Sequence, residues 1–151
     1  MNWHSKLFGN DPADSAGQRL RGQRVFCCDR GQRGGCGRTF AIFSGQVIPG
    51  HTVSASALWS LLEQLVKGQS IQGAARALGL PFALETVYHL LHRLRARLAG
   101  VRSLLAREQA APESLQTDPL LQTVEHLRLL FPNSPCPPAD FQLHFQRPLL
   151  E

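Results

Sequence analysis

The chain has 151 residues, of which 43% are hydrophobic and 18% charged, and this composition indicates a globular protein of one ordinary domain or two very small ones. Its formal net charge is +5, and 14 of its 16 Lys and Arg residues are Arg, a bias that fits a nucleic-acid partner but that a GC-rich genome would also give. The sequence has no apolar run of membrane-spanning length, no signal-peptide core and no disulfide framework, so we expect a cytoplasmic protein without a membrane partner.

The positive charge is concentrated in one part of the chain. Residues 1–16 carry a net charge of −1, residues 17–107 a net charge of +10, and residues 108–151 a net charge of −4. A charge of this size over the middle of the chain is the electrostatic footprint of a protein that binds a polyanion. The mildly acidic last part is better suited to packing or to protein contacts.

The first two segments precede the helical part of the chain. Residues 1–24 have little periodicity, and we expect them to be mostly irregular. In residues 25–53, the apolar pieces Val25-Phe26 and 40–43 flank a glycine-rich turn, which predicts a short β-hairpin followed by a linker.

Residues 54–110 predict a helical domain with three helices. Ser56 is the expected N-cap of the first helix, ALWSLLEQLVK, and Gly68 follows its end. Ser70 is the expected N-cap of the second, IQGAARAL, which stops at Gly79. The third helix is predicted from about residue 84 to about residue 106, because its apolar residues recur at intervals of three and four: Leu84, Val87, Leu91, Leu94 and Leu98.

Residues 111–151 predict a C-terminal helical extension, with one helix over 120–131 and a short one over 140–146. The apolar residues of the longer helix could pack on the core of the chain or form a homodimer: Leu120, Leu121, Val124, Leu127 and Leu130. The predicted fold class is mainly α, with a helix-turn-helix core, a short N-terminal β-hairpin and this extension.

The second and third helices suit a helix-turn-helix that reads double-stranded DNA. At 100° per residue, short polar groups and a base lie opposite the apolar stripe of the third helix, as a helix in the major groove requires: Glu85, Thr86, His89, His92 and Arg93. Arg76 on the second helix would read or position the DNA, and Arg97 further along the third would contact phosphates or only solvent. The alternative is an ordinary helical hairpin that binds no DNA.

Two motifs carry a resemblance to a known family. The pattern Ala75…Gly79…Val87 resembles the helix-turn-helix of bacterial transposases and regulators, with two more residues than usual between Gly79 and Val87. CGRTF, at 36–40, resembles the second knuckle of the zinc ribbons that precede this motif in insertion-sequence transposases. The resemblance covers roughly residues 20–100, but the first zinc knuckle is missing.

The ribbon resemblance implies candidate zinc ligands and candidate DNA-backbone contacts in the hairpin. The candidate ligands are Cys27, Cys28 and Cys36, and the candidate contacts are Arg30, Arg33 and Arg38. The alternative is a decayed ribbon without zinc, whose hairpin is held together by its phenylalanines.

No catalytic motif is present, and the few acidic residues do not lie in a segment that could form the metal-binding sheet of a transposase. We therefore expect a non-catalytic, double-stranded DNA-binding protein related to transposase recognition domains and associated with a mobile element, in which a second copy or a transposition protein is a further partner. A helical protein-interaction module and a remnant of a longer transposase are the alternatives.

Overall fold

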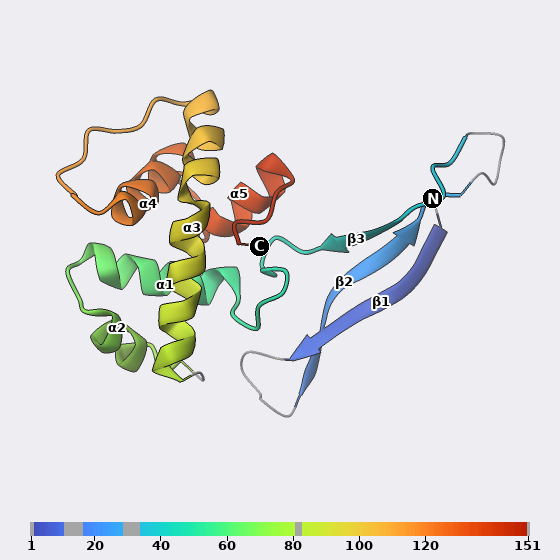
Figure 1. Cartoon of the computed structure of the whole chain (residues 1–151), viewed down its shortest axis with the longest axis horizontal. Helices are drawn as coiled ribbons and strands as arrows, with labels where there is room; N and C mark the ends of the chain where they lie inside the picture. Colours follow the sequence, from blue (N-terminus) through green and yellow to red (C-terminus); the bar gives the residue numbers. More distant parts are fainter. Residues whose placement is uncertain (1, 11–16, 29–33, 81–82, 151) are drawn as a thin grey trace.

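The computed structural model describes residues 2–10, 17–28, 34–80 and 83–150 of the chain. Three strands come first and pair in the order β1-β2-β3, namely β1 (Asn2–Asn10), β2 (Gln18–Phe26) and β3 (Thr39–Phe43). Five helices follow, as Figure 1 shows: α1 (Ala55–Val66), α2 (Ile71–Ala77), α3 (Leu84–Glu108), α4 (Pro119–Leu130) and α5 (Pro137–Phe145).

The chain is a mixed α and β protein, so the prediction of a mainly α fold is wrong. The expected hairpin is present, because Val25 pairs with Phe40 and Phe26 with Thr39. Residues 1–24, however, include all of β1 and most of β2. These strands lack the alternation of apolar and polar residues that marks a strand, because neither face of the sheet is covered along its length and Val25 is the one buried residue described in β1 to β3.

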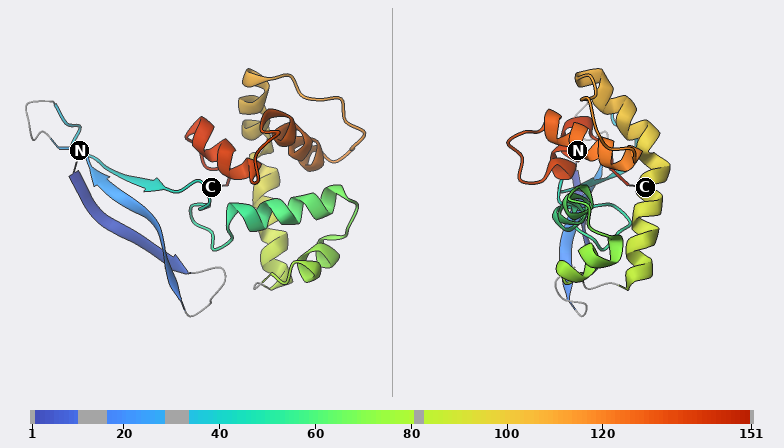
Figure 2. Two further views of the ribbon diagram at one scale, coloured as in Figure 1. Left: turned by 180° about the vertical axis from the view of Figure 1, so that it is seen from behind. Right: turned by 90° about the vertical axis from the view of Figure 1, so that its left-hand side faces the viewer.

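The three strands form a sheet arm, which we define as residues 2–10, 18–26 and 39–43. It extends to one side of the helices (Figures 1 and 2). Both strand pairs are antiparallel, and the β1–β2 register shifts twice, between Trp3 and Ser5 and between Leu7 and Phe8. Gly22 lies at the centre of the sheet, where a Cβ would meet the Ile42 carbonyl oxygen at 2.3 Å.

The helical body, residues 55–150, is organised around one apolar core. α1 supplies its centre, where Leu58, Leu61 and Leu62 are fully or almost fully buried. α1 begins two residues earlier than predicted, and its N-cap is Ser54, whose Oγ accepts a hydrogen bond of 3.1 Å from Ala57 N–H. The expected cap, Ser56, is exposed and lies 3.0 Å from Ser54 through the two hydroxyl oxygens.

The C-terminal extension belongs to this same core. Leu120, Val124 and Leu127 of α4 are each at most 2% exposed, so the apolar side of this helix is covered within the chain. Phe141 of α5 is completely buried, and the segment after α5 returns to the core with Leu149 and Leu150. Of the two uses considered for the α4 leucines, packing on the chain's own core is the one observed.

The sheet arm and the helical body are joined by the segment 44–54. Arg21 of β2 donates hydrogen bonds from Nη2 to the backbone oxygens of Ile48, at 3.2 Å, and of His51. Ile48 is completely buried in the helical core. The guanidinium of Arg21 therefore anchors the arm to a turn that is itself fixed by the core.

Among the helices that the structure describes, none is both long enough and apolar enough to cross a bilayer.

Candidate nucleic-acid interface

The turn between α2 and α3 begins as a Schellman motif. Ser70 Oγ accepts a hydrogen bond from Gly73 N–H at 3.1 Å and caps the start of α2, as predicted. At its end, Gly79 has a φ of +57°, Gly79 N–H donates to the Arg76 oxygen, and Leu80 N–H donates to the Ala75 oxygen. Residues 81–82 lie outside the described residues, and α3 begins after Ala83, which has no side-chain cap.

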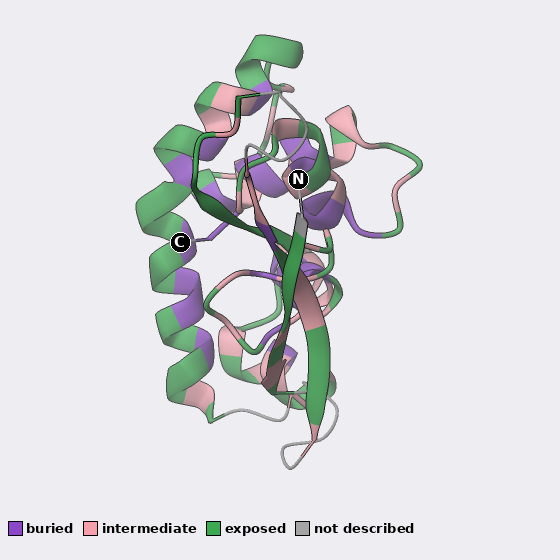
Figure 3. Cartoon of the chain, turned by 90° about the vertical axis from the view of Figure 1, so that its right-hand side faces the viewer, coloured by how far each residue is buried: buried purple, intermediate pink, exposed green. Residues whose placement is uncertain are grey.

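α2 packs against both α1 and α3, which gives the three-helix arrangement that a helix-turn-helix needs. Ala74 is completely buried at this contact. On α3, buried residues form one face, and Figure 3 shows the opposite face exposed along the helix. The predicted stripe is buried at Val87, Leu91, Leu94 and Leu98, while Leu84 at the end of the helix is half-buried.

All the predicted reading residues are exposed. They are Glu85, Thr86, His89, His92 and Arg93 on α3, together with Arg76 on α2 and Arg97 further along α3. With the exposed Tyr88, the groups offered to a ligand by the first three turns of α3 are thus one carboxylate, one aliphatic hydroxyl, one phenol, two imidazoles and one guanidinium. These are donors and acceptors of the kinds that contact base edges and phosphates.

Arg93 lies beside a second cationic feature, the turn that Arg21 anchors. The pKa of His51 is lowered from its usual value, first by burial and then by the positive charges of Arg93 and Arg21. Among the described residues no ion pair joins Arg93 to an acid. The positive charges of one arginine from α3 and one from β2 therefore both act on a half-buried imidazole, and a phosphate oxygen placed near His51 would be attracted by both charges.

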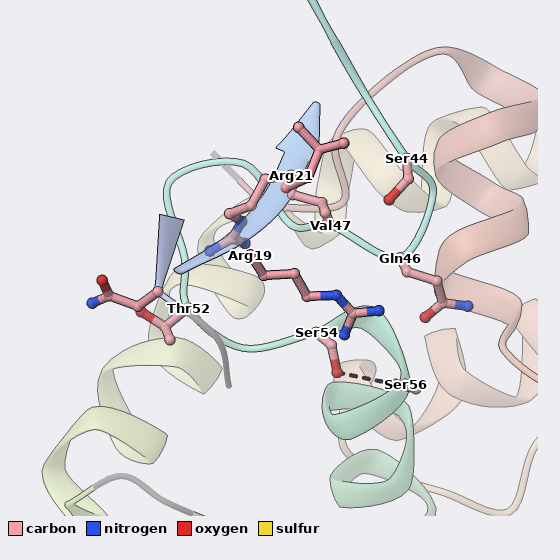
Figure 4. A pocket seen from close by; sticks show the side chains of 10 residues that line it. Arg19, Arg21, Ser44, Gln46, Val47, Thr52, Ser54 and Ser56 are labelled. Atoms are coloured by element: carbon pink, nitrogen blue, oxygen red, sulfur yellow. Dashed lines mark hydrogen bonds between the residues drawn. The ribbon is translucent and has the colours of Figure 1, made fainter. Parts of the chain in front are cut away.

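A polar cavity of about 310 Å³ continues this basic surface between β2 and the start of α1. Figure 4 shows the Arg19 side chain reaching toward Ser54 and Ser56, and Arg21 and Thr52 also line the cavity. Two guanidinium groups, four hydroxyls and the positive end of the α1 dipole suit an anionic group such as a backbone phosphate.

The remaining arginines of α3 differ in their ion pairs and in their exposure to solvent. Arg95 forms an ion pair of 2.9 Å with Asp118, the N-cap of α4, so it serves the helical body. Arg107 is exposed, and Arg102 is half-buried. Every described residue from 2 to 62 is neutral or basic, because the first acid in the described part of the chain is Glu63.

The cysteine cluster is only partly described. Cys27 and Cys28 are half-buried and Cys36 is exposed, and Cys36 N–H donates to Cys27 Sγ at 3.4 Å. Within the described ranges, no group of three or more His, Cys, Asp or Glu side chains is placed to hold a metal ion. Arg30 and Arg33 lie outside the described residues, whereas Arg38 is described and exposed.

Sequence reasoning missed the contribution of Arg19, Arg21 and His51. None of the three lies in a recognisable motif, and Arg21 reaches the His51 carbonyl across 30 residues of sequence. The one signal in the sequence is that residues 17–28 contain three arginines and no acidic residue. This pattern predicts a positively charged segment but not where its side chains lie in the fold.

In comparisons with models of protein families, with curated proteins and with solved structures, no match to this chain was found. The resemblance to transposase recognition domains therefore stays a prediction.

Proposed function

We propose that the protein binds double-stranded DNA and reads its target with α3, as a non-catalytic recognition protein of a mobile element that works in the cytoplasm. The single observation that carries this proposal is the exposed face of α3, on which all five predicted reading residues lie opposite the buried stripe. In this arrangement the leucines hold the helix on the core while its polar groups are free to enter a major groove.

The basic surface beside α3 supports the same proposal. A helix in the groove needs phosphate contacts on its flank to fix its register. Arg93 of α3, and Arg19 and Arg21 of β2, would supply these contacts from two elements. Arg76 on α2 would contact the backbone or a base edge on the other flank.

The experiment is a binding titration with two duplexes, one selected for affinity from a random pool and one of random sequence. His89→Ala and Arg93→Ala should weaken binding to the selected duplex more than binding to the random one. Because each phosphate contact adds about one unit to the slope of log affinity against log salt, Arg93→Ala should also reduce that slope by about one.

Arg107→Ala is the matched control, since it removes the same charge from an exposed position on the same helix. It lies 14 residues from Arg93, roughly 21 Å along the helix axis. If Arg93→Ala and Arg107→Ala weakened both duplexes equally, α3 would not read bases. If wild-type protein bound neither duplex even at low salt, the alternative of a helical protein-interaction module would replace this proposal.

A further inference from the structure

The outer face of the sheet arm carries exposed aromatic side chains. Trp3 pairs with Val25, and Val25 pairs with Phe40, so these three residues form one row across the three strands. Residues directly opposite each other in a sheet point to the same face, and Ile42, two residues after Phe40, shares that face. Trp3 is 72% exposed and Phe40 44% exposed, while Val25 between them is only 3% exposed.

At Trp3, Phe40 and Ile42 this face is exposed to solvent. The opposite face of the sheet carries Leu7, Arg24 and Phe43, which line a hollow together with the turn around His51. Leu7 and Phe43 are half-buried there. The sheet thus has one face toward the linking segment and one open face with two large aromatic side chains.

The open face is also cationic. Lys6 pairs with Gln23, which pairs with Ile42, so Lys6 lies on the open face, one row from Trp3. At the other end, Gly37 has a φ of +67°, Gly37 N–H donates to the Cys27 oxygen, and Cys27 N–H donates to the Arg38 oxygen. This pattern is a G1 β-bulge, which places Arg38 opposite Cys27 and on the same face as Phe40. Lys6 and Arg38 are both exposed.

We propose that this face binds an unpaired nucleic-acid strand, whose bases stack on Trp3 and Phe40 and whose phosphates contact Lys6 and Arg38. Strand spacing puts the two aromatic positions roughly 10 Å apart. Exposed aromatic side chains between cationic residues, with no acid among the described residues of the arm, resemble the stacking platforms and electrostatic grooves that bind single strands with little sequence preference. A protein partner would be expected to meet an apolar surface with mixed charges, and the described part of this face has positive charge alone.

This inference depends on the sheet arm and not on the duplex-binding role of α3. The test uses the full chain and a labelled oligothymidylate of about 12 nucleotides, within the site sizes of single-strand binders. Because Trp59 is buried at 6% exposure, quenching of tryptophan emission on addition of the oligonucleotide reports on Trp3. Trp3→Leu keeps the apolar area but removes the indole, and should weaken binding by roughly tenfold or more. Phe40→Leu should have a similar effect, and Trp3→Phe should recover most of the affinity.

Matched controls separate the two binding surfaces. Tyr88→Leu removes a half-exposed aromatic ring from α3, and it should leave oligothymidylate binding unchanged. Trp3→Leu should leave duplex binding unchanged, while Arg93→Ala should spare the single strand. Equal affinity of wild type and Trp3→Leu for oligothymidylate would overturn the inference. So would a wild-type dimer that becomes monomeric on Trp3→Leu in sedimentation experiments, because the face would then be an interface between two copies.

Discussion

The side-chain amide of Gln142 on α5 donates a hydrogen bond of 2.7 Å to the backbone oxygen of Gly45, 97 residues earlier in the chain. The same amide nitrogen donates to the Val47 oxygen at 3.1 Å, and the amide oxygen accepts from Leu149 N–H at 3.2 Å. One side chain therefore joins the segment leaving the sheet arm, the last helix and the C-terminal segment.

Gln142→Ala should lower the free energy of unfolding by about 1–3 kcal/mol, because it leaves partly buried backbone groups without partners. Gln72→Ala is the matched control, since Gln72 is exposed on α2, and its effect should be within about 0.5 kcal/mol. Urea unfolding followed by circular dichroism measures both. A loss no larger for Gln142→Ala than for the control would mean that these bonds exchange freely with water.

Two glycines should respond in opposite directions to the same substitution. Gly79 has a left-handed φ of +57°, so Gly79→Ala should destabilise the protein by about 1–2 kcal/mol and loosen the turn before α3. Gly100 lies inside α3, with nothing within 4 Å of an added Cβ, so Gly100→Ala should stabilise by about 0.5–1 kcal/mol. Thermal melting of the two variants beside the wild type is the measurement. Unchanged stability in Gly79→Ala would contradict the left-handed turn, and destabilisation by Gly100→Ala would contradict the open space beside that residue.

His51 should make folding sensitive to mild acid. Its pKa is lowered in the folded protein, so the folded state binds fewer protons than the unfolded state as pH falls. Its contribution to stability is fully present above the ordinary histidine pKa of about 6.5 and is lost as pH falls toward the lowered value. The urea midpoint of the wild type should fall between the high and the low end of that pH range. In His51→Gln the two midpoints should lie closer together, whereas the exposed-site variant His89→Gln should show the same difference as the wild type.

Removal of the Arg93 charge should change the pKa of His51. Arg93→Ala removes one of the two positive charges that lower this pKa, so the His51 pKa should rise toward the ordinary histidine value in an NMR titration. A duplex bound to the wild type should raise it too, by placing phosphate beside the ring. If the His51 pKa were unchanged in Arg93→Ala, the Arg93 charge would not act near His51, and Arg93 and Arg21 would not form a joint phosphate contact.

The four cysteines should differ in their reaction with a thiol reagent. Cys36 is exposed and should react fastest. Cys136 is buried, and burial raises the pKa of its thiol, so the reactive thiolate is scarce and this residue should react slowest until the protein unfolds. Peptide mapping after brief alkylation distinguishes the sites. Added zinc should protect Cys27, Cys28 and Cys36 together if these residues form the metal site that the ribbon resemblance implies.

The helices α1, α3 and α4 were predictable because each has an apolar stripe with a period near 3.6 residues that packs on the core. The stripe of α3, the Ser70 cap and the stop at Gly79 follow from the sequence alone. The start of α1 was missed, because Ser54 and Ser56 are both good N-caps and the buried Ala55 selects the earlier one.

β1 and most of β2 were not predictable from periodicity. A strand gives an alternating pattern only where one face is buried, and in the sheet arm apolar residues such as Trp3, Phe8 and Leu20 stay exposed. The position of Arg21 and His51 beside Arg93 depends on how the arm attaches to the helical body. That relationship is tertiary, so no local pattern in the sequence contains it.

The burial of Leu149 and Leu150 has a consequence for folding during synthesis. The sheet arm pairs neighbouring strands within residues 2–43, so it can form while the chain is still being translated. The core of the helical body cannot form at that stage, because it includes Phe141, Leu149 and Leu150, which leave the ribosome much later than α1. Until then the apolar side of α1 is open to chaperones, and slow translation of residues 119–150 would prolong that exposure.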